Sequence, residues 1–261
     1  MVDLLELVLI GSFAGFTIFL GLPIVLLGIG DKVRGFLNAF AVGILMFLIV
    51  DVFSHAWDTT TSAAVAAYQG AGPAWDAAAY LILMFAGISI GLLGLVLYER
   101  SYMGKGQDAV TPAKVSTMTA LGIGAHNLSE GLAIGQSFAA GLVGLGVVLA
   151  VGFAAHNATE GFGITAPLVG SEKRPEVSFL AKVLFIGGVP TLIGTLVGSV
   201  SYSPDAYVFF LALAGGALVY VTMLMFNTGR RRYSSGLMMS GIFLGLCLGF
   251  ITDLIVSLGG A

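Results

Sequence analysis

Long apolar stretches, separated by short polar segments, run through the whole chain of 261 residues. A helix needs about 20 mostly apolar residues to cross a membrane. Eight stretches reach this length: residues 4–29, 35–57, 77–98, 114–138, 142–168, 178–200, 205–227 and 236–258. Each is too long for a barrel strand and lacks alternation of polar and apolar residues. The pattern predicts an all-α membrane protein with eight transmembrane helices, in a single domain over residues 1–261.

The positive charges are sorted to one side of this arrangement. Every Lys and Arg lies in or next to the connections that follow the first, third, fifth and seventh predicted helices: Lys32, Arg34, Arg100, Lys105, Lys114, Lys173, Arg174, Lys182, Arg230, Arg231 and Arg232. Cytoplasmic loops are enriched in Lys and Arg. We therefore predict that both termini are extracytoplasmic, in a multi-pass protein of the plasma membrane.

The composition agrees with a membrane environment. The chain is 57% hydrophobic and only 10% charged, whereas soluble domains carry roughly 25% charged residues. This number of charges is too small to cover the surface of a soluble protein of this size. We therefore expect the chain to be surrounded by a lipid bilayer. The net charge of −3 gives no support for a nucleic-acid partner.

A short motif, His-Asn-x-(Ser/Thr)-Glu-Gly, occurs on both the fourth and the fifth predicted helix. His126 and Glu130 are four residues apart and share one helix face, and His156 and Glu160 repeat this spacing. An imidazole nitrogen and a carboxylate on one face suit a divalent cation such as Zn²⁺, Fe²⁺ or Mn²⁺. Each motif therefore predicts one half of a metal site.

The spacing of the two motifs predicts that the halves meet. The two helices are joined by a short glycine-rich connection and run antiparallel. The pairs His126–Glu160 and Glu130–His156 have the same sum of residue numbers, which centres the hairpin on residue 143. We expect a mid-membrane cluster between helices four and five. Charges at this depth cost about 2.5–3.5 kcal/mol each, which a bound cation would offset.

The residues beside these ligands have their own expected roles. Asn127 and Asn157 stand three residues before the glutamates, so their oxygens could form a second, weaker cation position. Gly131 and Gly161 leave room for a neighbouring helix to approach. An alternative for the whole set is that the polar groups only hold helices together by hydrogen bonds. The duplication and the matched register favour metal binding.

Acidic residues near the extracytoplasmic helix ends leave two interpretations open. Asp51 and His55 form another pair four residues apart on the second predicted helix. They are metal ligands, either in an outer vestibule or as a contribution from a third helix to the central site, or they form an interfacial helix cap. Asp253, near the end of the last helix, is expected at the interface, with an ion-attracting rim as the alternative.

Together, the eight spans, the outside termini and the twice-occurring motif resemble the ZIP (Zrt-, Irt-like protein) family of divalent metal transporters. The resemblance implies secondary transport of Zn²⁺, Fe²⁺, Mn²⁺ or Cd²⁺, usually toward the cytoplasm, without enzymatic activity or a cofactor. It implies a bundle that slides against a scaffold, and it leaves a homodimer open. The implied ligands are His126, Asn127, Glu130, His156, Asn157 and Glu160.

Two departures from the family pattern change these expectations. Family members often carry Pro before the Glu, where this chain has Ser129 and Thr159, whose hydroxyls are expected to bond back to the helix backbone. The sixth predicted helix has no Asp or Glu, which weakens the expectation of a second metal. A membrane-embedded zinc hydrolase and a cation or proton channel remain alternatives.

Overall fold

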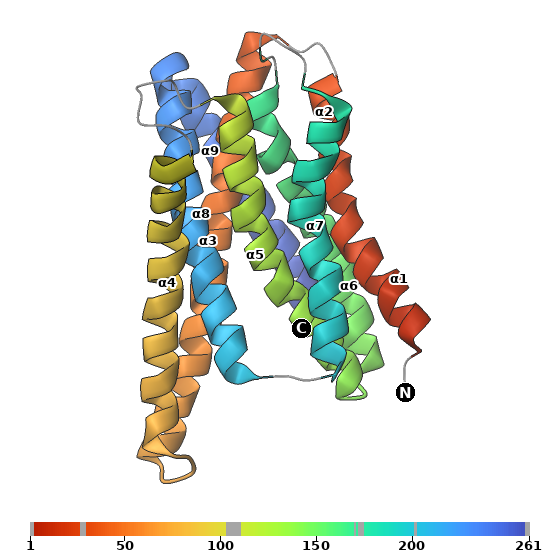
Figure 1. Cartoon of the computed structure of the whole chain (residues 1–261), viewed down its shortest axis with the longest axis vertical. Coiled ribbons are helices and arrows are strands. Elements are labelled where there is room, and N and C mark those ends of the chain that lie inside the picture. The colour runs from red at the N-terminus through yellow and green to blue at the C-terminus, as the bar shows by residue number, and fades with distance from the viewer. Residues whose placement is uncertain are drawn as a thin grey trace.

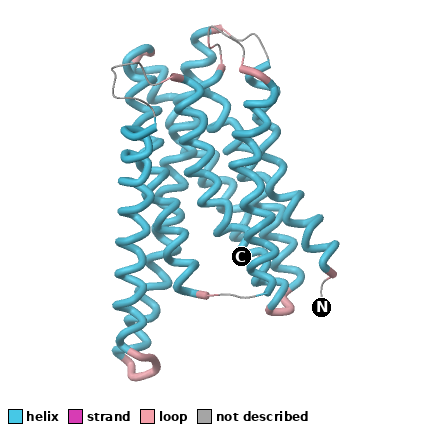
Figure 2. The backbone as a smooth tube through the Cα atoms, viewed as in Figure 1, coloured by secondary structure: helices cyan, strands magenta, loops and turns pink. Residues whose placement is uncertain are grey.

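The structure is a computed structural model that describes residues 3–26, 30–102, 111–169, 171, 175–200 and 203–258 (Figure 1). Almost all of this part is helical, the loops are short, and it contains no strand (Figure 2). The expected all-α fold is confirmed. Three of the basic loop residues, Lys105, Lys173 and Arg174, lie outside the described residues. The backbone of His156 and Thr159 is described, but their side chains are not.

Each predicted stretch coincides with helix. The elements are α1 (Leu4–Phe16), η1 (Thr17–Gly21), α2 (Leu22–Leu26), α3 (Asp31–Tyr68), α4 (Ala74–Tyr102), α5 (Pro112–Ala139), α6 (Val143–Thr165), η2 (Ala166–Leu168), α7 (Val177–Val200), α8 (Pro204–Arg232) and α9 (Ser235–Leu258). By length and composition, seven candidate membrane spans are found in the described part. The remaining long helix, α5, has 28 residues but carries the polar motif, and it is mostly buried against other helices. The count of eight therefore stays a prediction.

Two of the predicted helices have different limits in the structure. The first is interrupted by the 3₁₀ segment η1, just before Pro23, whose missing N–H cannot continue a regular α-helix. The second was predicted to end at residue 57, but α3 continues to Tyr68. Three consecutive threonine hydroxyls, of Thr59, Thr60 and Thr61, each donate to the carbonyl four residues earlier. These bonds satisfy the polar side chains within the helix. The predicted end of the second helix at residue 57 is therefore wrong.

The helices pack as two groups. The motif bundle consists of α1, η1, α2, α5, α6 and α7, and the scaffold of α3, α4, α8 and α9. Within the motif bundle, backbones touch at glycines: a Cβ added at Gly131 would clash with the Thr191 carbonyl of α7, and one at Gly161 with the Ile18 carbonyl of η1. The expectation that these two glycines admit a neighbouring helix is confirmed.

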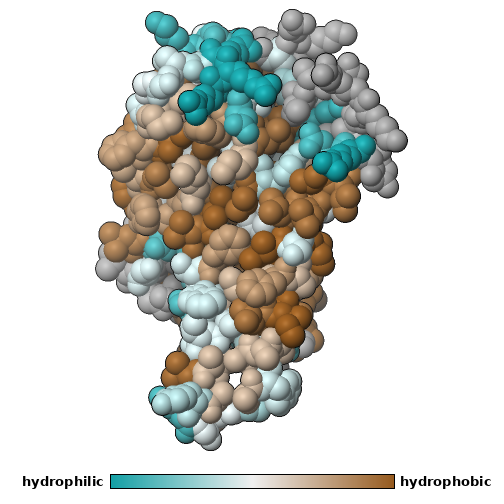
Figure 3. All heavy atoms as spheres, turned by 90° about the vertical axis from the view of Figure 1, so that its left-hand side faces the viewer, coloured by the Kyte–Doolittle hydropathy of each residue, from teal (hydrophilic) through white to brown (hydrophobic). Residues whose placement is uncertain are grey.

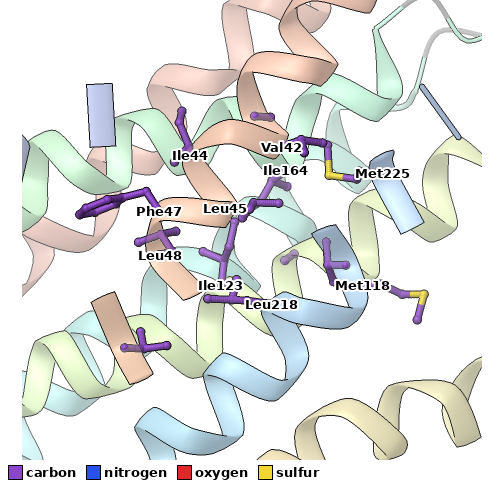
Figure 4. Packing of buried hydrophobic residues seen from close by; sticks show 14 of the residues in the cluster. Val42, Ile44, Leu45, Phe47, Leu48, Met118, Ile123, Ile164, Leu218 and Met225 are labelled. Atoms are coloured by element: carbon purple, nitrogen blue, oxygen red, sulfur yellow. The ribbon is translucent and has the colours of Figure 1, made fainter. Parts of the chain in front are cut away.

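The boundary between the two groups lacks such interlocking. A Cβ added at Gly122 of α5 would lie 3.5 Å from the Cβ of Ala217 in α8, an ordinary contact distance. For the glycines whose surroundings are described, some added Cβ atoms would come within 3.0 Å of another element. In every such case that element belongs to the same group as the glycine. Apolar side chains fill the boundary (Figure 4): Leu45, Leu48, Met118, Ile123, Ile164 and Leu218. The two groups therefore meet across a smooth apolar surface.

The two ends of the molecule differ in charge. The termini and the connections after α3, α5 and α7 lie toward the lower end in Figure 1, here called the termini end. The described Lys and Arg residues lie at or near helix ends on the opposite side, here called the basic end. Figure 3 shows a broad apolar band below a hydrophilic upper end. Which end faces the cytoplasm stays a prediction.

Candidate metal centre

The hairpin of α5 and α6 brings the two motifs together. Residues 140–142 connect the helices, with Gly141 in the left-handed region at φ 76°, close to the predicted centre at 143. The Nε2 atom of His126 lies 3.9 Å from Oε1 of Glu160. The predicted pairing of His126 with Glu160 is therefore confirmed. The matching pair of Glu130 with His156 stays a prediction, because the His156 side chain lies outside the described part.

Three ionisable side chains converge at this point, away from solvent. The Nε2 atom of His126 also lies 3.3 Å from Oε1 of Glu130, and the side chains of His126, Glu130 and Glu160 are 3%, 5% and 0% exposed. Two buried carboxylates repel each other unless a proton or cation lies near them. Among the described side chains, no three His, Cys, Asp or Glu groups already stand in a geometry that holds a metal ion.

The two motif asparagines occupy equivalent environments. The Asn127 amide nitrogen donates to the Gly187 carbonyl of α7 at 3.0 Å, and the Asn157 amide nitrogen donates to the Ala14 carbonyl of α1 at 2.9 Å. Both asparagines are fully buried, and both Oδ1 atoms have no hydrogen-bond partner among the described residues. The amide nitrogens thus fix the side chains to neighbouring helices, while the oxygens accept no hydrogen bond from the described residues.

A cavity of about 130 Å³ leads to the cluster from the termini end. Such a volume holds several water molecules. Its walls come from both groups of helices: Phe47, Asp51, His55, His126, Ser129, Glu130, Ala133, Leu149, Phe153, Tyr207, Leu211, Asp253 and Ser257. A hydrated ion therefore has space to reach His126 and Glu130 from this end.

The predicted pair Asp51 and His55 lies along this cavity. The His55 Nδ1 atom is 3.0 Å from the Asp51 backbone carbonyl and 3.4 Å from the Asp51 carboxylate. A carbonyl only accepts, so Nδ1 is the donor in this contact. Asp253 lines the same cavity. This placement favours the alternative of an acidic, ion-attracting rim over a purely interfacial role for Asp253.

On the basic-end side, apolar side chains close off the cluster. Ile123 lies three residues before His126, and Ile164 lies four residues after Glu160, both in the direction of the basic end. Both are fully buried and belong to the apolar boundary in Figure 4. The cluster is therefore accessible from one end and sealed from the other.

Sequence reasoning was wrong about one residue of the motif. Ser129 was expected to bond to its own helix backbone, but its Oγ atom is buried and has no hydrogen-bond partner among the described residues. It lines the cavity beside His126 and Glu130. Its position between two ligands in the motif is the only signal the sequence carried.

Comparison with known proteins places the chain in a family. Residues 98–253 match the family model described as ZIP Zinc transporter. The chain belongs to the ZIP zinc transporter family. The matched segment includes α5, α6, α7 and α8 and therefore both motifs. Membership in this family, with several helices of membrane-spanning length, makes the chain a multi-pass integral membrane protein.

Two relatives of this ZIP family protein are mammalian. Zinc transporter ZIP10 of Mus musculus and Zinc transporter ZIP10 of Homo sapiens are each 29% identical to it over 157 residues. The aligned segment covers 56% of this chain and 18% of each relative. The chain thus matches less than a fifth of the length of these relatives.

Proposed function

We propose that this ZIP family protein is a secondary carrier of divalent transition metal ions, with Zn²⁺ as the main substrate and Fe²⁺, Mn²⁺ and Cd²⁺ as further ones. The ions move toward the cytoplasm across the plasma membrane. The observation that carries the proposal is the buried convergence of His126, Glu130 and Glu160 at the inner end of a cavity. With His156, they make a borderline nitrogen and oxygen ligand set.

The charge distribution along the cavity supports an inward route for cations. Asp51 and Asp253 line the cavity and attract positive ions from the termini end. His55 lines the same cavity and adds an imidazole ring to its wall. An ion would pass these groups and shed water before it reaches His126 and Glu130. Its positive charge would then offset the repulsion between the buried carboxylates of Glu130 and Glu160.

Release to the other side requires that the cluster move past the scaffold side chains of the apolar boundary, Leu45, Leu48 and Leu218. In this arrangement the motif bundle slides against the scaffold, as the family resemblance implies, and carries both motifs with it. The smooth boundary supports such motion, because ordinary van der Waals contacts such as Gly122 with Ala217 can be remade after a shift. The interlocked backbones inside each group keep each group rigid.

The asparagines support a second, weaker cation position beside the first. Their oxygens are hard ligands and lie where the amide nitrogens already hold them in place. Helix α7, which could have contributed a carboxylate, contains no Asp or Glu. A second ion would therefore depend on the neutral asparagine oxygens and on Glu130 and Glu160, which would contact both ions. It would bind less tightly than the first.

Uptake into proteoliposomes tests the function and the site together. Purified protein should drive Zn²⁺ uptake, and Glu130→Gln or Glu160→Gln should abolish it. Asp58→Asn, which removes an exposed carboxylate outside the cavity, should leave uptake unchanged. If both glutamine variants transport normally, the site is wrong. If the unmodified protein moves no divalent ion, the carrier function is wrong, and a current that persists without divalent ions would identify a channel.

A further inference from the structure

Ser129 is unusual among the hydroxyl residues of α5. The hydroxyls of Thr117, Thr119 and Ser137 on the same helix each donate to the carbonyl four residues earlier, at 2.9 Å. Ser129 Oγ makes no such bond, although its side chain is only 2% exposed. Ser116 is also buried without a described partner, but it does not line the cavity that leads to the cluster.

The position of Ser129 on the helix explains its access to the cavity. At about 100° per residue, Ser129 lies about 60° to one side of His126 around the helix axis, and Glu130 about 40° to the other. All three residues line the same cavity. Ala133, one turn closer to the termini end, lines it as well. An ion that moves inward along α5 therefore meets Ser129 and Glu130 before it reaches His126.

The chemistry of a buried hydroxyl without a partner fits a cation ligand. No backbone carbonyl holds this hydroxyl, so its oxygen can turn toward an ion without breaking a hydrogen bond to the protein. It carries no charge and therefore adds no repulsion to the two glutamates. It is also a harder ligand than imidazole, which favours oxygen-preferring ions.

We propose that Ser129 supplies a hydroxyl oxygen ligand to the divalent cation in the cavity, beside His126 and Glu130, and thereby helps to set which ions are accepted. This inference rests on the proposed carrier function. The oxygen replaces one water of the incoming ion. Without it, hard ions such as Mn²⁺ lose more affinity than soft ions such as Cd²⁺.

A cysteine-protection experiment tests whether the ion reaches Ser129. The chain has one cysteine, Cys247, so Cys247→Ser gives a thiol-free background. Ser129→Cys and, as a matched control, Ser257→Cys, at the outer part of the same cavity, are each treated with a small methanethiosulfonate reagent. Zn²⁺ at ten times its dissociation constant should slow modification of the first about tenfold and leave the second nearly unchanged. Equal rates with and without Zn²⁺ at residue 129 would overturn the proposal.

Substitutions that keep or remove the hydroxyl test its role as a ligand. Ser129→Ala should weaken Mn²⁺ binding about tenfold, as expected for one lost neutral contact, with a smaller effect on Cd²⁺. Ser129→Thr should restore the original order of ions, and Ser116→Ala should not change it. An unchanged ratio of Mn²⁺ to Cd²⁺ affinity in Ser129→Ala would refute the ligand role. These measurements read binding, so an absence of uptake in the unmodified protein would count against the carrier function separately.

Discussion

A cross-link between the two helix groups should stop transport completely. The pair Gly122→Cys and Ala217→Cys, in a Cys247→Ser background, joins α5 of the motif bundle to α8 of the scaffold. A Cβ at position 122 would lie 3.5 Å from the Cβ of Ala217, within the range of about 3.5–4.5 Å found in disulfides. A disulfide can therefore form without movement of either helix.

The size of the effect follows from the distance that the cluster has to travel. To carry the cluster past the scaffold side chains that share the apolar boundary with Ile123 and Ile164, such as Leu45 and Leu218, the motif bundle must shift by about one helical turn, or roughly 5.4 Å. The disulfide allows the two Cβ atoms to separate by only about 1 Å. The permitted movement is thus several times smaller than the required one. The initial rate of Zn²⁺ uptake should fall in proportion to the cross-linked fraction.

The assay compares uptake before oxidation, after oxidation with iodine and after reduction. Reduction should restore the rate. The control pair is Ala66→Cys with Gly72→Cys, whose Cβ atoms would lie 3.4 Å apart within the scaffold hairpin. It should cross-link equally well and keep its activity. Full transport by protein that is completely cross-linked between 122 and 217 would refute the sliding of one group against the other.

Three further predictions concern packing, the asparagines and the cavity mouth. Gly131→Ala should lower the free energy of unfolding by about 1–3 kcal/mol, because the added Cβ has no space against α7. Gly122→Ala should not lower it. Thermal unfolding in detergent measures both variants, and equal melting temperatures would contradict the packing argument. Asn157→Ala should remove the hydrogen bond to the Ala14 carbonyl and lower the free energy of unfolding by about 1 kcal/mol in the same assay. It should also weaken binding of a second ion, and metal analysis of the purified protein counts the bound ions. Asp253→Asn should raise the KM for Zn²⁺ and make this KM less dependent on ionic strength, because the substitution removes attraction at the cavity mouth only. The maximal rate should not change. A reduced maximal rate with an unchanged KM would place Asp253 elsewhere in the mechanism.

Several features of the site were readable from residue spacing. The contact of His126 with Glu160 follows from two helices in an antiparallel hairpin, where position along one helix fixes the facing position on the other. The close approach at Gly131 and Gly161 follows from the absence of a side chain beside each glutamate. Both features depend only on residue type and on spacing along a helix, so the regular geometry of helices makes them predictable from the sequence.

Other features depended on which surfaces meet. Asp253 is far from Asp51 in the sequence, and only the packing of α9 against α3 brings both to one cavity. The second helix was predicted to end at residue 57, but the hydroxyls of Thr59, Thr60 and Thr61 bond to carbonyls of the helix itself and α3 continues to Tyr68. Ser129 had a backbone carbonyl within reach, as Thr119 and Ser137 do, yet it faces the cavity instead.

By itself, the sequence determined the membrane setting, the helical class and the residue types of the buried His and Glu cluster, because each of these depends on residue type and on spacing within one or two helices. Only the tertiary structure decided how the helices divide into two groups, which end of the cluster is open and what seals the other end. Those properties depend on contacts between helices far apart in the chain, such as Ile123 of α5 with Leu45 of α3 and Leu218 of α8 in the shared apolar boundary. Apolar residues favour burial without specifying a partner, so their pattern alone cannot choose among the arrangements that bury them.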